Sequence, residues 1–193
     1  MFTMKCSFHI TRLSTIIFIV FSAAVFASCN KSDNTKSTTI VKCVTCANGG
    51  LCINDTCRCP AGYEGTSCQT LSSQKFLSSW NVIEKGTLTS SRTYSIEIQN
   101  NFSLSINSVQ VSNFYNYFFF TPVTGTVSSD TLYIPSQHAQ GKIIAGIGYI
   151  HSDPSFGQFG AITMRYMVTD SITGQIDDFG YNSSTDSPSQ WRK

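Results

Sequence analysis

Charged residues are scarce in this chain of 193 residues, of which Asp, Glu, Lys and Arg together make up only 12%. So small a share excludes a coiled coil and a charged disordered chain. The chain also lacks the basic stripe that a nucleic-acid binder needs, so we expect no nucleic-acid partner. Hydrophobic residues nevertheless make up 41% and aromatic residues 12%, which is enough to form a core. We therefore expect one ordinary domain, or a small domain joined to a very small one.

Catalytic signatures are absent as well. Neither a Gly-x-Ser-x-Gly nor a His-Glu-x-x-His motif occurs, and His138 and His151 belong to no recognisable motif. Asp177 and Asp178 are adjacent, so on a strand they would face opposite sides and could not converge on one substrate. We predict a protein without catalytic residues, metal ions or cofactors. A pair of catalytic carboxylates, as in a glycosidase, could still be drawn from Glu84, Glu97, Asp153 and Asp170.

The N-terminal region has the organisation of an export signal. Residues 1–12 contain Lys5 and Arg12 and no acid, and Leu13–Phe26 is a mostly apolar run that ends in small residues. A basic start, a short apolar stretch and small residues before the cleavage point are typical of a secretory signal. The run is shorter than the roughly 20 residues that a membrane-spanning helix needs. We predict a signal peptide over residues 1–28 and no transmembrane helix.

A single cysteine follows this signal. Phe26-Ala27-Ser28-Cys29 resembles the lipobox of Bacteroidetes and other bacterial lipoproteins, whose cysteine is lipidated and becomes the new N-terminus. Ordinary cleavage after Ala27 is the alternative, and it would leave seven cysteines and hence an unpaired thiol. Lipidation of Cys29 leaves six, which can pair. The resemblance implies an exported protein anchored by lipid to the bacterial outer membrane, on its periplasmic or its surface side. The polar residues 29–42 would form a flexible tether.

Six cysteines crowd into residues 43–68, and the 125 residues that follow contain none. Behind an export signal this density predicts disulfides, because so short a segment cannot bury a stabilising core. Spacing alone permits 15 pairings. A zinc site is the alternative, with Cys43 and Cys46 as its first half. It lacks a well-spaced second half, because Cys57 and Cys59 are separated by one residue only.

Residues 43–68 form the sequence CVTCANGGLCINDTCRCPAGYEGTSC, with an Asn-Gly-Gly turn before the third cysteine and Gly-Tyr-Glu-Gly before the last. In these positions the segment resembles an EGF-like domain over its whole length. The resemblance implies a noncatalytic spacer or protein-contact module. Lys42 stands where calcium-binding members carry an acidic or amide ligand, so we expect no calcium. The disulfides that the resemblance implies are Cys43–Cys52, Cys46–Cys57 and Cys59–Cys68.

The C-terminal part is rich in Ser, Thr, Asn, Ile, Val, Phe and Tyr, which favours strands over helices. Apolar and polar residues alternate with a period of two, as from Ile162 to Thr169, and turn residues separate such segments. We predict a linker over residues 69–75. Residues 76–193 would form an antiparallel up-and-down β-barrel, or a sandwich, of about eight strands. The predicted strands are 78–86, 92–99, 103–112, 116–127, 130–135, 142–151, 158–169 and 175–181.

The start of this domain carries a second resemblance. Ser79-Trp80 is loosely similar to the opening of lipocalin-like barrels, in which a tryptophan plugs the closed end, although Ser78 replaces the glycine of that family. The resemblance implies a carrier of a small apolar ligand. Gly146 and Gly148 lie in one predicted strand and indicate bending or close packing. No helix follows them, which excludes a nucleotide-binding loop.

The densest aromatic segment is 113–120. On a strand, Tyr117 and Phe119 would share one face, and Phe118 and Phe120 would share the other. One pair would fill the core, and the other would be exposed or would line a site, unless the strand is buried on both faces. We expect the segment to bind a protein, a glycan or a small apolar ligand. The candidate binding residues are Phe114, Tyr115, Tyr117, Phe118, Phe119 and Phe120.

These features favour a lipid-anchored, noncatalytic protein of the cell envelope that acts in binding or adhesion. The alternatives are a lipocalin-like carrier and an extracellular hydrolase. The interior of the barrel separates the three hypotheses. A filled interior favours the binding protein, a hollow apolar interior favours the carrier, and an open polar cleft favours the hydrolase.

Overall fold

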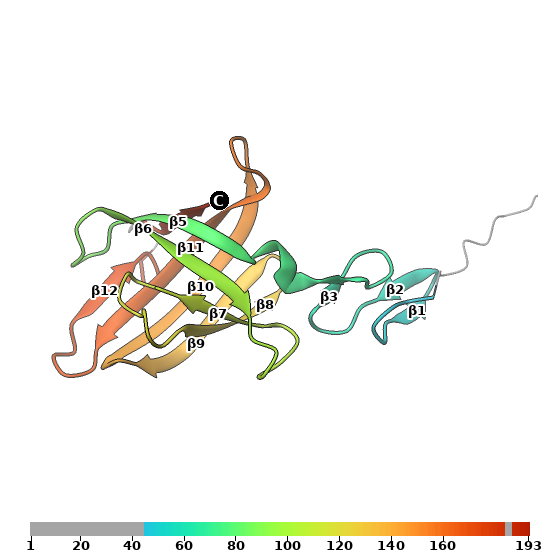
Figure 1. Cartoon of the computed structure of the whole chain (residues 1–193), viewed down its shortest axis with the longest axis horizontal. Coiled ribbons are helices and arrows are strands. Elements are labelled where there is room, and N and C mark those ends of the chain that lie inside the picture. Colours follow the sequence, from blue (N-terminus) through green and yellow to red (C-terminus); the bar gives the residue numbers. More distant parts are fainter. Residues whose placement is uncertain (1–44, 184–186) are drawn as a thin grey trace, which may run out of the picture. The chain divides into compact units, whose positions relative to one another are not determined.

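The computed structural model describes residues 45–183 and 187–193, and they form almost only β-structure (Figure 1). The predicted signal peptide, Cys29, the tether and Cys43 lie outside these residues. No helix in the described ranges has the length and hydropathy of a membrane span. The first elements are β1 (Leu51–Ile53), β2 (Thr56–Arg58), β3 (Tyr63–Glu64), β4 (Thr70–Leu71) and the 3-10 turn η1 (Ser72–Lys75).

Residues 45–71 form a small disulfide module of two antiparallel hairpins, β1–β2 and β3–β4. Asn54 and Asp55 join β1 to β2, and both have positive φ, as a tight two-residue hairpin turn requires. Disulfides join Cys46 to Cys57 and Cys59 to Cys68, with Cα–Cα distances of 5.7 and 5.2 Å. They are two of the three bonds that the sequence resemblance implies. Cys52 is disulfide-bonded as well.

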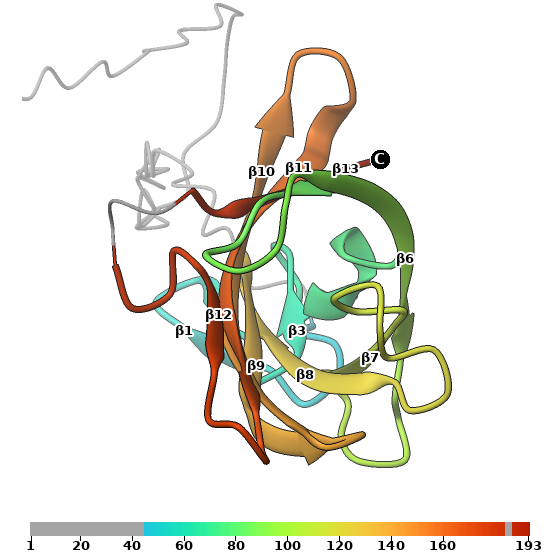
Figure 2. The same cartoon turned by 90° about the vertical axis from the view of Figure 1, so that its left-hand side faces the viewer.

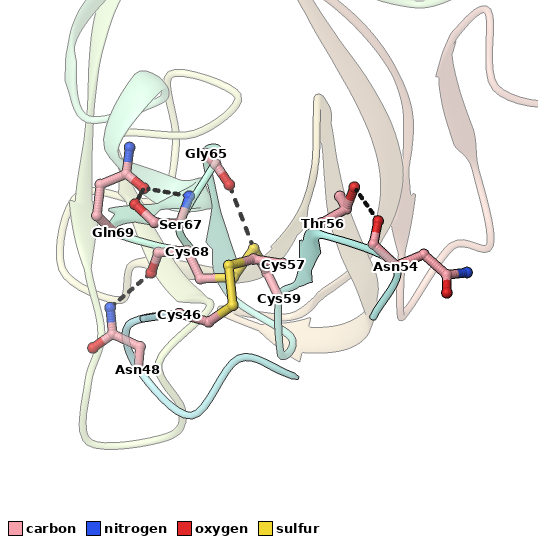
Figure 3. Close-up of a disulfide and its surroundings, with 10 residues drawn as sticks. All are labelled: Cys46, Asn48, Asn54, Thr56, Cys57, Cys59, Gly65, Ser67, Cys68 and Gln69. Carbon is pink, nitrogen blue, oxygen red and sulfur yellow. Dashed lines mark hydrogen bonds between the residues drawn. A yellow bond between two sulfur atoms is a disulfide. The ribbon is translucent and has the colours of Figure 1, made fainter. Parts of the chain in front are cut away.

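Tight local contacts surround these bonds (Figure 3). The Asn48 side-chain amide donates to the Cys68 carbonyl at 2.8 Å. A side chain on Gly50 would place its Cβ 2.8 Å from Sγ of Cys68, so the turn needs a glycine at this position. The side-chain oxygen of Gln69 accepts from both the backbone and the hydroxyl of Ser67. Crosslinks and hydrogen bonds thus replace a hydrophobic core in this module.

The segment predicted as a linker, residues 69–75, is regular structure. It contains β4, which pairs with β3, and η1, whose Ser72 and Ser73 are buried. The Ser72 N–H donates to the Gly62 carbonyl at 2.9 Å. Sequence composition missed this because serines, which usually occupy loops, are here buried beside the barrel.

The remaining residues form a closed antiparallel barrel of eight strands, as predicted. Strands β5 to β11 follow one another up and down, β13 lies between β11 and β5, and pairing of β10 with β11 closes the ring. Closure excludes the sandwich alternative. The bounds are β5 (Ser78–Glu84), β6 (Arg92–Asn100), β7 (Ser108–Ser112), β8 (Val123–Ser128), β9 (Thr131–Ala139), β10 (Lys142–Asp153), β11 (Gly157–Asp170), β12 (Ile176–Phe179) and β13 (Ser189–Arg192).

The last two strands differ from the prediction. The predicted strand 175–181 is β12, which pairs only with the final residues of β11 and is not one of the eight closing strands. The strand that completes the barrel is β13, which was not predicted. It pairs with β11 and β5 and buries Ser189 and Trp191. Four residues at the end of the chain are too few to show an alternation on their own.

The aromatic segment, residues 113–120, also differs from the prediction, because it is not part of a strand. The predicted strands 103–112 and 116–127 begin later, at Ser108 and Val123, and residues 113–122 form a loop between them. Within this loop Asn113, Tyr115 and Asn116 have φ of 58°, 60° and 50°. A strand needs strongly negative φ, so these left-handed residues break the predicted alternation.

Buried side chains fill the barrel. The largest are Trp80, Trp191, Tyr166, Phe76, Phe114, Phe118 and Phe179. Gly146 and Gly148 mark close packing, as predicted, because an added Cβ would lie 2.6 Å from Met164 Cε and 2.7 Å from Met164 Sδ, respectively. At one end of the barrel, here called the η1 end, the Trp80 indole donates to the Phe76 carbonyl at 2.8 Å. The opposite end, where β5 finishes, is called the Glu84 end.

Candidate functional site

The six candidate aromatic residues divide into three groups at the Glu84 end. Phe114 and Phe118 are buried and plug the barrel there. The Phe114 ring packs edge-to-face on Tyr166 and Trp191, with centroids 4.7 and 5.9 Å away. These two phenylalanines therefore belong to the core and are not accessible to a ligand.

Tyr115 is partly buried and connects the loop to its neighbours. Its hydroxyl donates to Oδ2 of Asp177 at 2.9 Å, and the Arg92 guanidinium lies 4.4 Å from the centre of its ring. Burial raises the pKa of Tyr115 above its ordinary value. The hydroxyl therefore stays protonated near neutral pH and can donate to Asp177.

Tyr117, Phe119 and Phe120 are exposed. The expectation that Phe118 and Phe120 share a face is wrong, since Phe118 is fully buried and Phe120 is 94% exposed. The Tyr117 hydroxyl donates to the Gln140 carbonyl at 3.4 Å, and Lys142 lies 5.0 Å from the centre of its ring. Tyr117 thus lies against the β9–β10 turn, whereas the two phenylalanines make no such contact.

Two further loops expose apolar side chains at the same end. Loop 85–91 follows β5 and loop 171–175 follows β11, and both lie with loop 113–122 at the end that faces the viewer in Figure 2. Their tips carry Leu88 and Ile172, which are 61% and 92% exposed. We call Leu88, Phe119, Phe120 and Ile172 the apolar rim.

The bases of these loops are held by Asp177 and by the β9–β10 turn. Oδ1 of Asp177 accepts from the backbone N–H of Leu88 at 2.8 Å, and its carboxylate also accepts from Thr89 and Tyr115. The Ser171 N–H donates to the Gly141 carbonyl at 3.0 Å. Loops 85–91 and 113–122 are therefore fixed to β12, and loop 171–175 to the β9–β10 turn.

A buried polar network lies beneath the rim. The fully buried carboxylate of Glu84 accepts on Oε1 from Nε and Nη2 of Arg92, at 3.0 and 2.8 Å, and from the Tyr94 hydroxyl at 2.9 Å. On Oε2 it accepts from Tyr166 at 2.8 Å and from Ser189 at 2.7 Å. Five donated hydrogen bonds compensate the cost of burying this carboxylate.

The titration of its partners follows from this arrangement. Burial is the main cause that raises the pKa of Tyr94 and Tyr166 well above the ordinary value, and the charge of Glu84 raises both further, so both phenols remain donors. Burial lowers the pKa of Arg92, but its bond and ion pair with Glu84 outweigh this and raise the pKa overall. The network is thus a fixed support for the loops above it.

The four carboxylates considered for a glycosidase pair do not come together. Glu84 is enclosed in its network, Glu97 accepts from Gln99 on the outside of β6, and Asp153 is paired with Arg192. Asp170 accepts from the backbone of Thr173 and Ile172 and from Lys142, which lowers its pKa to about 2. None of the four shares a hydrogen-bond partner with another.

The two aspartates and two histidines considered from the sequence do not converge on one site either. Asp177 holds loop 85–91, whereas Asp178 accepts from the backbone of Tyr181 and Asn182, so the two face different partners as expected. His138 is exposed, and Nε2 of His151 lies 3.0 Å from the Thr163 hydroxyl on the surface. In the part of the chain that the structure describes, no three His, Cys, Asp or Glu side chains are grouped so that they could hold a metal ion.

Sequence reasoning missed Leu88, Ile172 and the polar support. Glu84 had a detectable signal, because it follows Trp80 and Val82 on the inward face of β5 and is the only charge in that alternation. Leu88 and Ile172 had no such signal in the sequence, since single apolar residues in loops are common.

No protein-family model matches the chain, and no curated protein matches its sequence.

Proposed function

We propose that this chain is a lipid-anchored, noncatalytic binding protein of the bacterial cell envelope, and that the apolar rim is its contact surface. The single observation that carries the proposal is the exposure of four large apolar side chains on three loops at one barrel end. Large apolar side chains that project from several loops at one end of a protein mark a candidate interaction surface. The bonds of Asp177 keep two of these loops in place without a ligand.

The packing of the barrel supports a binding protein over a lipocalin-like carrier. A carrier needs an apolar cavity of some hundreds of Å³. Here the interior is occupied by large buried side chains, and even a methyl group on Gly125 would lie 2.8 Å from Leu132. The carboxylates of Glu84, Glu97, Asp153 and Asp170 are separated, which likewise supports a noncatalytic protein over a hydrolase.

Lipid anchoring rests on the lipobox-like residues and on cysteine parity. Cys46, Cys52, Cys57, Cys59 and Cys68 are all disulfide-bonded, as an EGF-like module would require. The resemblance assigns Cys43 to Cys52, which leaves Cys29 for lipidation. Mass spectrometry of the mature N-terminus tests this. A peptide that begins at Ser28, or an unmodified Cys29, would contradict it.

The rim is tested with the mature chain, residues 29–193, carrying Cys29→Ser, so that neither the signal peptide nor a lipid anchor can hide other binding. We would measure retention on isolated bacterial envelope fragments for this protein and for a Phe119→Ser/Phe120→Ser variant. The matched control is Phe102→Ser/Leu104→Ser, in the loop at the η1 end, where the side chains are 57% and 64% exposed. We expect the rim variant alone to lose retention while keeping its melting temperature. Equal loss in both variants, or none in either, would refute the proposal.

A further inference from the structure

We infer that the partner of the apolar rim is a lipid bilayer, into which Leu88, Phe119, Phe120 and Ile172 insert. The inference rests on the proposed function, because it names the partner of the same surface. It commits to lipid and not to a protein or a glycan, and three features of the rim favour that choice.

The first feature is the isolation of the side chains. Phe120 and Ile172 are 94% and 92% exposed, so hardly any atom of the protein lies beside them. A rigid protein partner binds best to a patch or pocket where neighbouring side chains pack together. Acyl chains are fluid and can surround separate projecting side chains. The rim therefore suits a fluid apolar medium better than a complementary rigid surface.

The second feature is the chemistry of the tips. The rim side chains are hydrocarbon only, and the exposed polar residues beside them, such as Thr121 and Thr173, are mostly small, uncharged hydroxyl residues that can stay hydrated among lipid headgroups. The polar groups at the loop bases are directed inward, with Tyr115 bonded to Asp177 and Tyr117 to the Gln140 carbonyl. They are satisfied within the protein, so approaching a membrane would not strip them of partners.

The third feature is compensated charge. Arg92 is paired with Glu84 at 2.8 Å, and Lys142 with Asp170 at 3.3 Å. The exposed Lys85 at the start of loop 85–91 has a long side chain that can extend to a lipid phosphate. Insertion therefore buries no uncompensated charge, and we expect binding to depend only weakly on anionic lipid and on salt.

The proposed anchor would supply the membrane. Fifteen residues lie between Cys29 and Thr45, the first described residue, and such a segment spans at most about 55 Å when fully extended. A lipid on Cys29 would keep Thr45, at the start of the disulfide module, within that range of a bilayer, so that insertion of the rim becomes a second contact of an already tethered protein.

The experiment uses the mature chain, residues 29–193, with Cys29→Ser, so that neither the apolar signal peptide nor a lipid is present. It is mixed with protein-free vesicles, one set of phosphatidylcholine and one of phosphatidylethanolamine with phosphatidylglycerol. We expect the protein to float with both sets. Phe119→Ser/Phe120→Ser should lower the partition coefficient at least about tenfold, which corresponds to about 1.4 kcal/mol. Phe102→Ser/Leu104→Ser should change it less than about twofold, since these exposed apolar side chains lie at the η1 end, opposite the rim.

A gain of signal complements this loss. Trp80 and Trp191 are buried, so a Phe120→Trp variant adds one exposed indole whose emission should shift to the blue when vesicles are added. This variant keeps an aromatic ring at the tip, so it remains informative if the serine variant fails to fold.

Three results would overturn the inference. In the first, vesicles bind neither the protein nor the tryptophan variant, but envelope fragments still retain the protein through Phe119 and Phe120. The partner is then a protein or a glycan, and only this inference fails. If vesicles and fragments both fail, the proposed function fails with it. If the rim and control variants lose vesicle binding equally, the attraction is not located at the rim.

Discussion

The buried network under the rim allows one stability prediction in detail, for Glu84→Gln. The carboxylate is enclosed and accepts five hydrogen bonds, two of them from Arg92. Glutamine keeps the size of the side chain but removes the negative charge and replaces one acceptor by an amide donor. Arg92 would then lose its ion pair, and either Tyr94 or the pair of Tyr166 and Ser189 would face a donor where an acceptor had been.

The magnitude follows from the exposure of the partner. Removing one member of a buried ion pair costs about 3–5 kcal/mol. The Arg92 side chain is 25% exposed, so water can partly solvate the released guanidinium, and the lower figure applies. We expect a loss of about 3 kcal/mol in the free energy of unfolding. For a chain of this size that corresponds to a fall in melting temperature of about 6–12 °C.

Thermal and urea unfolding, followed by circular dichroism, measure this loss. Glu97→Gln is the matched control, because Glu97 lies on the outside of β6 and accepts only from Gln99 at 3.0 Å. Its free energy of unfolding should stay within about 0.5 kcal/mol of the wild-type value. Arg92→Met combined with Glu84→Gln should cost less than the sum of the single changes, since no unpaired charge remains. A loss below about 1 kcal/mol for Glu84→Gln would refute the reasoning.

Three further predictions concern other parts of the chain. Nζ of Lys75 forms ion pairs with Glu64 in the disulfide module, at 2.9 Å, and with Asp130 in the β8–β9 turn of the barrel. Reduction of the disulfides should therefore lower the melting temperature of the barrel, measured by calorimetry, by a few degrees. In the Lys75→Met variant reduction should leave that melting temperature unchanged. Because folding raises the pKa of Tyr94 and Tyr166, their contribution to stability is complete below about pH 10 and is lost as the pH rises further. Urea unfolding at a series of pH values measures this loss of unfolding free energy above pH 10. The loss should be smaller in Tyr166→Phe than in the wild type and should be the same as in the wild type in Tyr133→Phe, at the surface. Folding lowers the pKa of Asp170 to about 2, so its contribution is present above about pH 4 and is lost toward pH 2; Asp170→Asn should flatten the stability profile in that range.

The barrel could be predicted from the sequence where side chains alternate over long strands. From Ile162 to Val168 every second residue is apolar, and β11 buries those residues inside the ring. Such a pattern depends only on the pleat of the strand, which local sequence determines. The four residues of β13 lack this length, and their place between β11 and β5 depends on contacts with residues far away in the chain. Local pattern therefore predicts the strands but not which strand closes the barrel.

The aromatic segment marks the limit of the same reasoning. Its composition predicts a strand, because Phe and Tyr favour strands and no glycine or proline interrupts residues 113–120. The left-handed φ of Asn113, Tyr115 and Asn116 depends instead on where the side chains are held, with Phe114 in the core and Tyr115 against Arg92 and Asp177. Arg92 is 23 residues before Tyr115 and Asp177 is 62 residues after it in the sequence, beyond the reach of any local pattern. Once Phe114 and Phe118 are buried and Tyr115 is held against Asp177, the short loop has no inward place left for Phe119 and Phe120, and this is why they reach the surface together. Core packing and the candidate binding surface are thus two consequences of one loop conformation, so a change that releases Phe114 should also displace the rim.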